Sequence, residues 1–327
     1  MHSKFNNSLM KKILILTFLT LFLVSCKEKS EKEQAVAAIP VTLKIERFDK
    51  LFFETPDAGL PDLERQYPFL FPKQFDDAVW LEKKHDPIMK ELYDEVQKKY
   101  SDISPVKEEL EKVVQHIRYY FPEEQTPRVI TLVSEMDLES RVIYEKGLVL
   151  IALDLYLGKE HRFYEFPEYL KITFEPRQMM PDLVTSFSQR YLQPAANNTL
   201  LALMIHEGKL LYLKDVLLPD YSDAEKIAYT DEQVKWVQSN QEQMWRFLID
   251  EDILFDNNPR MAARFIDPAP FTKFGLDIDN ASPGKAGAWI GWQIVRSYMK
   301  NNDVSLQELL QMDAKELFEN SKYKPKK

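Results

Sequence analysis

The sequence predicts an α+β domain that is predominantly helical, with a small β-sheet and a helical C-terminal half. Short apolar runs typical of strands fall between residues 41 and 153. Beyond Gly158 nearly every apolar pattern has the helical period. Hydrophobic residues make up 45% of the 327 residues and aromatic residues 12%, which is enough apolar material for a well-packed core. These observations favour a folded domain over a disordered chain.

The predicted sheet is built from short segments. Residues 41–48 alternate between apolar and polar side chains, as a half-buried strand does. Residues 128–134 form an apolar run that is typical of a buried strand. Residues 142–144 and 148–153 flank Gly147, and this arrangement predicts a β-hairpin.

Helical periodicity covers much of the remaining chain. The predicted helices are residues 78–100, 106–120, 181–191, 198–216, 231–254, 284–301 and 305–318. The second of them follows Pro105, which suits the first turn of a helix. The sequence contains no internal repeat, and no linker follows Pro40. We therefore expect a single globular domain over residues 41–327.

The N-terminus has the order of a lipoprotein signal peptide over residues 1–25. A positively charged segment at residues 4–12 precedes an uncharged apolar run at residues 13–24, and Ser25-Cys26 follows. A membrane-spanning helix needs about 20 apolar residues, so this run is too short for one. The end of the segment resembles a lipobox, which predicts that Cys26 carries fatty acyl groups such as palmitate. The alternative is a chance cysteine after an uncleaved anchor.

Composition limits what holds the chain at a membrane and what it binds. Cys26 is the one cysteine, so no internal disulfide stabilises the core. Residues 26–40 read as the lipidated cysteine and a flexible charged tether. The net charge is −9, which argues against nucleic acid as a partner and against electrostatic adhesion to anionic lipid. The lipid must therefore supply the attachment to the membrane. Only 8 glycines are present, which disfavours a glycine-rich phosphate loop.

The clearest chemical motif is His206-Glu207 on the predicted helix 198–216. Zinc peptidases carry His-Glu-x-x-His on a helix, because residues four apart share a face and both imidazoles reach one metal ion. Here Leu210 occupies the second histidine position and cannot bind zinc. The nearest replacement ligand is Glu242, on the following helix. The motif indicates either a partly buried polar pair without catalysis or an atypical zinc site, and the missing ligand favours the first.

The order of elements nevertheless looks zincin-like: a sheet with a hairpin, a His-Glu helix, then a helix that offers a glutamate. We interpret this arrangement as a degenerate scaffold, because a fold cannot supply an activity that its ligands do not support. The sequence therefore favours a protein that is not an enzyme and needs no cofactor over one that binds zinc.

The predicted helix at residues 284–301 carries Gly287 and Gly291 four residues apart. Small residues on one face of a helix allow another helix to approach closely. The alternative is an exposed surface for a protein partner, with Trp289 and Trp292 as its anchors. The sequence alone is compatible with both interpretations.

Several segments after residue 128 resemble the GldB family of gliding motility lipoproteins from Bacteroidetes. The matching segments are 156–159, 161, 163–164, 166–169, 204–209, 229–230, 270–271, 282–284, 291–299 and 321–325. This family is similar to predicted zinc peptidases whose metal motif is incomplete. The resemblance implies a role in surface gliding, alongside envelope machinery that also serves protein secretion.

Two hypotheses about function follow from the residues and the resemblance together. In the first, the chain is a lipid-anchored cell-envelope protein outside the cytoplasm, at the outer membrane, that binds other gliding or secretion proteins through a pseudo-peptidase domain. In the second, it is a zinc-dependent envelope peptidase with an atypical site at His206 and Glu207.

Overall fold

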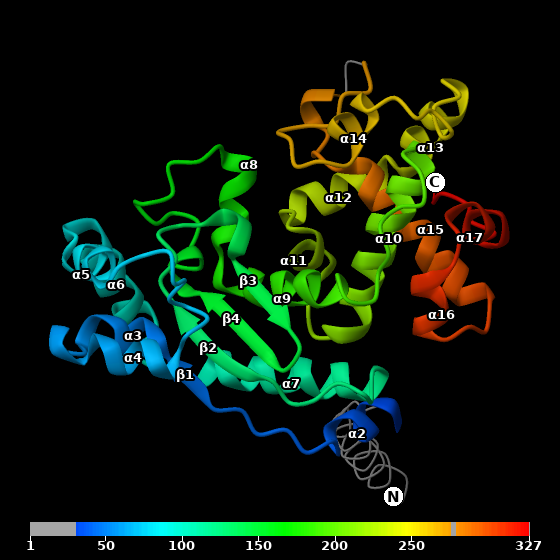
Figure 1. Cartoon of the computed structure of the whole chain (residues 1–327). Coiled ribbons are helices and arrows are strands. Elements are labelled where there is room, and N and C mark those ends of the chain that lie inside the picture. Colours follow the sequence, from blue (N-terminus) through cyan, green and yellow to red (C-terminus); the bar gives the residue numbers. More distant parts are fainter. Residues whose placement is uncertain (1–30, 276–278, 327) are drawn as a thin grey trace, which may run out of the picture. The chain divides into compact units, whose positions relative to one another are not determined.

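The computed structural model describes residues 31–275 and 279–326 (Figure 1). The signal peptide predicted at residues 1–25 and the lipidated Cys26 lie outside the described residues. The chain divides into two compact units with the boundary after Pro40, and each is described by itself.

The first unit contains helix α2 (Glu31–Ala37). This helix lies within residues 26–40, the segment predicted as a tether. The helix is rich in glutamate, lysine, glutamine and alanine, which are strong helix formers. Glu31 and Glu33 stand in its first turn, where a negative charge stabilises the positive end of the helix dipole.

The second unit contains a four-stranded mixed sheet with the order β1-β2-β4-β3 (Figure 1). The strands are β1 (Ile45–Arg47), β2 (Arg128–Leu132), β3 (Val142–Glu145) and β4 (Leu148–Ala152). β2 pairs in parallel with both β1 and β4. β3 pairs with β4 antiparallel, which confirms the predicted hairpin. The first strand is shorter than predicted at both ends, since residues 41–44 have no regular secondary structure and helix α3 begins at Phe48.

Both faces of the sheet are covered. On β2, Val129 packs into the main core, whereas Ile130 on the opposite face packs against an aromatic cluster that includes Phe48 and Phe52 of α3. Successive strand residues point to opposite faces, so two buried neighbours require cover on both sides.

Helices make up most of the rest of the second unit, which confirms the predominantly helical α+β class. Before β2 the chain forms α3 (Phe48–Glu54), α4 (Leu60–Gln66), α5 (Asp77–His85), α6 (Pro87–Lys99) and α7 (Ser104–Tyr120). After β4 it forms α8 (Glu168–Lys171), α9 (Met179–Ser188), α10 (Leu200–Leu217), α11 (Asp223–Ile227), α12 (Asp231–Ser239), α13 (Gln241–Asp250) and α14 (Arg260–Phe265). The C-terminal helices are α15 (Ala286–Asn301), α16 (Leu306–Gln311) and α17 (Ala314–Asn320).

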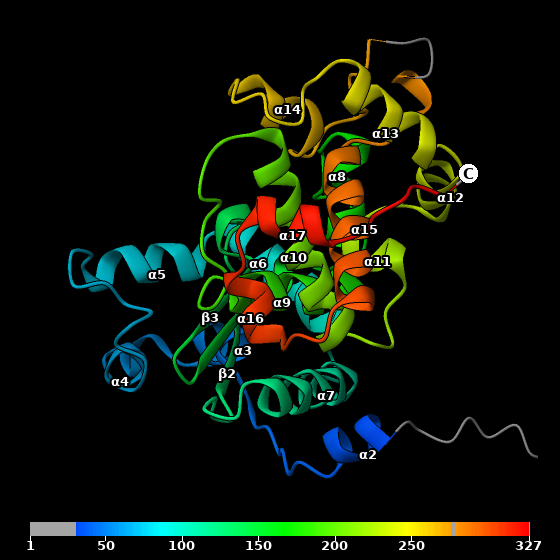
Figure 2. The same ribbon diagram turned by 90° about the vertical axis from the view of Figure 1, so that its right-hand side faces the viewer.

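Helices α10 and α15 lie side by side and have the most extensive contact between any two elements of the second unit (Figures 1 and 2). Helix α17 contacts both of them, and α16 contacts α10. α10 also packs on α9, which in turn covers the edge strand β3. The His-Glu motif therefore lies on a helix that links the sheet side of the domain to its C-terminal helices.

Candidate functional site

Helix α10 begins at a side-chain cap. Thr199 Oγ1 accepts a hydrogen bond from the backbone N–H of Ala202 at 3.3 Å. The helix is apolar on nearly all sides, and buried residues such as Leu201, Met204, Ile205 and Leu213 surround its axis. A helix that is apolar all round belongs inside a domain. The polar residues of the His-Glu segment are therefore held in fixed surroundings.

Glycines set the distance between α10 and α15. A Cβ on Gly208 would lie 2.5 Å from the backbone carbon of Gly291 and 2.9 Å from the backbone nitrogen of Trp292. A Cβ on Gly291 would overlap the carbonyl group of Met204. The two backbones touch at these positions, so only glycine fits. This contact agrees with the close-approach interpretation of Gly287 and Gly291, and at Gly287 a Cβ would lie 2.9 Å from the carbonyl oxygen of Phe265.

The exposed partner surface predicted for this helix is wrong. Trp289 is 2% exposed and Trp292 is 0% exposed. The rings pack edge to face, with centroids 5.5 Å apart. Gly287 and Gly291 are buried as well. The sequence carries a small-residue stripe and two large aromatic residues, and both features serve packing within the domain.

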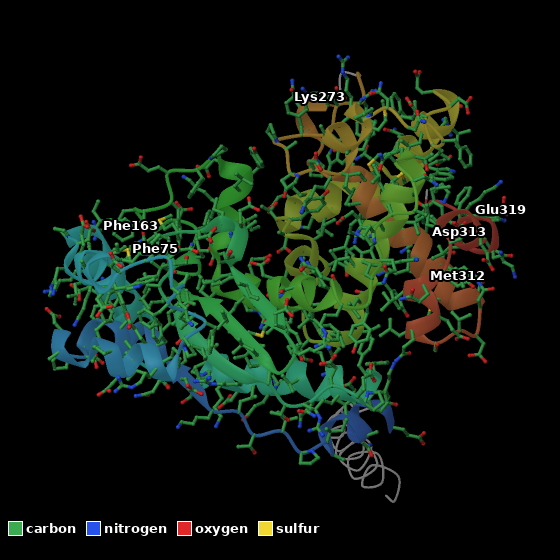
Figure 3. All side chains as sticks on the ribbon, in the orientation of Figure 1. Phe75, Phe163, Lys273, Met312, Asp313 and Glu319 are labelled. Carbon is green, nitrogen blue, oxygen red and sulfur yellow. The ribbon has the colours of Figure 1, made fainter. Side chains whose placement is uncertain are left out.

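His206 lines a cavity of about 210 Å³ together with Lys209. These residues are three apart on α10 and therefore share a face. The opposite wall is the connection between α16 and α17, which carries Met312 and Asp313 (Figure 3). The loop from Gln193 to Ala196, which precedes α10, closes a further side.

Lys209 is the buried cation of this cavity. Its side chain is 6% exposed, and Nζ donates to the carbonyl oxygens of Leu310 at 3.3 Å and Met312 at 2.5 Å. Burial lowers the pKa of Lys209 to about 8, and the negative charge of Asp313 opposes that shift. These bonds attach α10 to the connection between α16 and α17.

Glu207 lies outside this cavity, although it is the neighbour of His206 in sequence. Its carboxylate acts instead on two lysines, Lys214 and Lys285. Burial lowers the pKa of Lys214, and it lowers the pKa of Lys285 to about 8; the charge of Glu207 partly offsets both shifts. Lys214 Nζ donates to the carbonyl oxygen of Lys226 at 3.3 Å.

Among the described residues, the candidate ligands His206 and Glu242 belong to no cluster of three or more side chains that could hold a metal ion. Leu210 stands at the second histidine position. Glu242 pairs with Arg246 at 2.9 Å, one turn further along α13. Over residues 31–275 and 279–326, no group of three His, Cys, Asp or Glu side chains has an arrangement that holds a metal ion. The side chains around His206 do not fit catalytic zinc, which takes three protein ligands, because its neighbour in the cavity is an ammonium group.

The sequence did not indicate the ion network on the far half of α10. Arg296 on α15 donates to both carboxylate oxygens of Asp215 at 2.7 Å, and to those of Asp223 at 2.9 and 2.7 Å. Trp292 Nε1 also donates to Asp215, at 2.9 Å, and Lys226 pairs with the same carboxylate at 3.0 Å. This network joins α10, α11 and α15. In the sequence these charges resemble ordinary surface residues, and only the fold brings them together.

The fold and the site define a class: a helix-rich α+β domain with a His-Glu helix that lacks the second metal-binding histidine. The family model of gliding motility protein GldB matches residues 29–325, so the chain belongs to the GldB family. No curated protein and no solved structure matches the chain. Within the described ranges, no helix combines the length and the apolar character that a membrane crossing requires.

Proposed function

We propose that this gliding motility protein is a lipid-anchored component of the cell envelope that binds other gliding or secretion proteins and catalyses no reaction. Acylated Cys26 would hold it at the outer membrane, with the domain outside the cytoplasm. The observation that carries the non-catalytic part is the set of side chains around His206. One imidazole, one buried ammonium and Leu210 replace the three zinc ligands of a peptidase.

The surroundings of Glu207 support the same conclusion. In a zinc peptidase this glutamate activates the water bound to the metal, so it must face the metal ligands. Here the histidine lines the cavity and the glutamate acts on Lys214 and Lys285. A glutamate that does not line the histidine's cavity is not placed to activate a water bound there.

Metal analysis and hydrolysis assays test the non-catalytic part. The full chain is purified in detergent, its zinc content is measured, and cleavage of a peptide library is compared for wild type, Glu207→Gln and Glu242→Gln. We expect no stoichiometric zinc and no cleavage that depends on Glu207. Zinc at one ion per chain, with cleavage lost in Glu207→Gln, would establish the peptidase alternative, and loss of both zinc and cleavage in Glu242→Gln would identify Glu242 as the replacement ligand.

A second experiment tests partner binding. The full chain, with an affinity tag at its C-terminus, is purified from chemically crosslinked cells, and the co-purified proteins are identified by mass spectrometry. We expect gliding or secretion proteins in amounts comparable to the bait. Recovery of the bait with only abundant envelope proteins would contradict a partner-binding role.

A further inference from the structure

The cavity beside His206 contains a buried positive charge with one donor left. An ammonium group has three N–H donors, and Lys209 uses two of them on the carbonyl oxygens of Leu310 and Met312. Both acceptors are neutral, and in the described part of the chain Lys209 makes no ion pair. A buried charge without a counter-charge is costly. The lining of the cavity thus provides a site for an anion.

Asp313, the negative group whose charge acts on Lys209, is already engaged. Asp313 Oδ1 accepts hydrogen bonds from the backbone N–H groups of Lys315 at 2.8 Å and Glu316 at 3.1 Å, where it caps α17. Asp313 is also exposed, so water screens its charge. The charge of Asp313 raises the pKa of Lys209, but burial lowers it by more, so the net shift is downward.

The size and lining of the cavity restrict the anion. A volume of about 210 Å³ is below the roughly 300–1,000 Å³ of pockets for drug-sized ligands. The apolar side chains that line the cavity include three alanines outside α10, which are Ala195, Ala196 and Ala314. Ile205 of α10 also lines it. Gln193, Gln311 and Asp313 also border the cavity, so these alanines and Ile205 form the apolar part of a mixed lining. A carboxylate attached to a small apolar side chain matches these dimensions.

We propose that this cavity binds the C-terminal carboxylate of a partner peptide whose last residue has a small side chain. The ammonium of Lys209 holds one carboxylate oxygen with its third N–H, and the imidazole of His206 lies beside it as a second polar contact. Capture of a terminal carboxylate is a recurring mode of peptide recognition. The inference rests on the proposed function, because it names how a non-catalytic domain would hold its partner.

Paired small ligands test the chemistry directly. Binding of N-acetylalanine, N-acetylalaninamide and acetate to the full chain in detergent is measured by ligand-observed NMR titration. We expect N-acetylalanine to bind at least about tenfold more tightly than the amide, because only the acid places a charge against the ammonium. We expect acetate to bind more weakly, because it lacks the side chain that fills the apolar wall. Equal affinity for the acid and the amide would overturn the proposal. Equal affinity for acetate and N-acetylalanine would overturn the peptide part of it.

Variants locate the binding in this cavity. Lys209→Met should abolish the preference for the acid, whereas Lys300→Met, at an exposed lysine near the end of α15, should keep it. Ala195→Leu, from the loop before α10, fills the cavity without touching the contact between α10 and α15, so it tests the site even where Lys209→Met does not fold. An acid preference that survives Ala195→Leu would place the binding elsewhere. A zinc-dependent cleavage would refute the proposed function alone, since the acid preference is read without turnover.

Discussion

At the scale of single residues, charged side chains of helix α10 are buried at its contacts with α11, α15 and the connection between α16 and α17. Lys209 and Lys214 of α10 end on backbone carbonyl oxygens, whereas Asp215 of the same helix is held by Arg296. Sequence reasoning identified His206 but could not identify its cavity. Lys209 donates to the backbone carbonyl of Leu310, which lies 101 positions further along the chain. Every residue type has a backbone carbonyl, so the sequence does not mark this acceptor. Only long-range packing determines such a contact.

The lowered pKa of Lys209 predicts a pH dependence of stability. The folded value is about 8 and the ordinary value is 10.5, so above pH 8 the unfolded chain binds more protons than the folded chain. The contribution of Lys209 to the free energy of unfolding therefore rises between pH 8 and pH 10.5, by up to about 3 kcal/mol. We expect the free energy of unfolding of wild type to increase relative to Lys209→Met from pH 7.5 to pH 10 in urea titrations.

Comparing the two proteins cancels the contribution of the buried tyrosines, whose raised pKa values lower stability above pH 10 in both. Burial, for example, raises the pKa of Tyr100 and of Tyr229. Parallel stability curves for wild type and Lys209→Met across this range would mean that the amine of Lys209 titrates as in water.

Removal of the Asp215 carboxylate should destabilise the domain strongly. Asp215→Ala leaves the Arg296 guanidinium with Asp223 alone and removes the acceptor of Trp292 Nε1. Breaking a buried ion pair on one side costs about 3–5 kcal/mol, and these groups are partly exposed, so we expect about 3 kcal/mol. Urea unfolding of Asp215→Ala measures it, with Asp220→Ala as the control at an exposed aspartate. A loss below about 1 kcal/mol would show that water replaces the network.

At the scale of elements, the sequence predicts the long periodic segments well and their interruptions poorly. β2, the β3–β4 hairpin and helices α7, α10 and α15 form where the periodicity predicts them. The predicted helices 78–100, 231–254 and 305–318 each form two helices.

Local polar groups explain two of these three divisions, the one before α6 and the one before α17. Pro87 lacks a backbone N–H and begins α6, which Asp86 caps with bonds to Ile88 N at 2.8 Å and Met89 N at 2.9 Å. Asp313 begins α17 in the same way. An apolar stripe continues across such a break, so periodicity alone does not detect it.

The contact between α10 and α15 predicts a steep dependence on side-chain size at Gly291. Its Cβ would overlap the carbonyl group of Met204, so even alanine must separate the helices. Propensity alone would make Gly291→Ala stabilising by about 0.5–1 kcal/mol. Overpacking costs about 1–3 kcal/mol, and we expect it to dominate in Gly291→Ala and to exceed that range in Gly291→Leu. Thermal melts measure both variants.

A matched control lies on the same helix. Lys300 is exposed near the end of α15, and Lys300→Ala should melt like wild type. Gly147→Ala is not a control for size, because Gly147 has a φ of 71° and would be strained for a different reason. A Gly291→Leu protein with the melting temperature of wild type would mean that the two helices separate at no cost.

At the scale of the whole molecule, the net charge limits how the protein can be held at a membrane. The chain has a net charge of −9, so an anionic membrane surface repels it. No helix within residues 31–275 or 279–326 can cross a membrane. Membrane attachment through Cys26 would therefore have to come from its acyl chains. A single acyl chain gives marginal, reversible binding, whereas two chains give stable anchoring.

Replacement of Cys26 by alanine should remove the lipid anchor. The variant should take up no clickable fatty acid and should lose its stable association with the membrane, whereas Ser25→Ala, which keeps a small residue before the cysteine, should be labelled like wild type. Labelling in growing cells, followed by fractionation at low and at high salt, measures both effects. The anchor is apolar, so high salt should not release wild type. Equal labelling of Cys26→Ala and wild type would contradict the lipid anchor. Release of wild type by high salt would indicate electrostatic attachment instead.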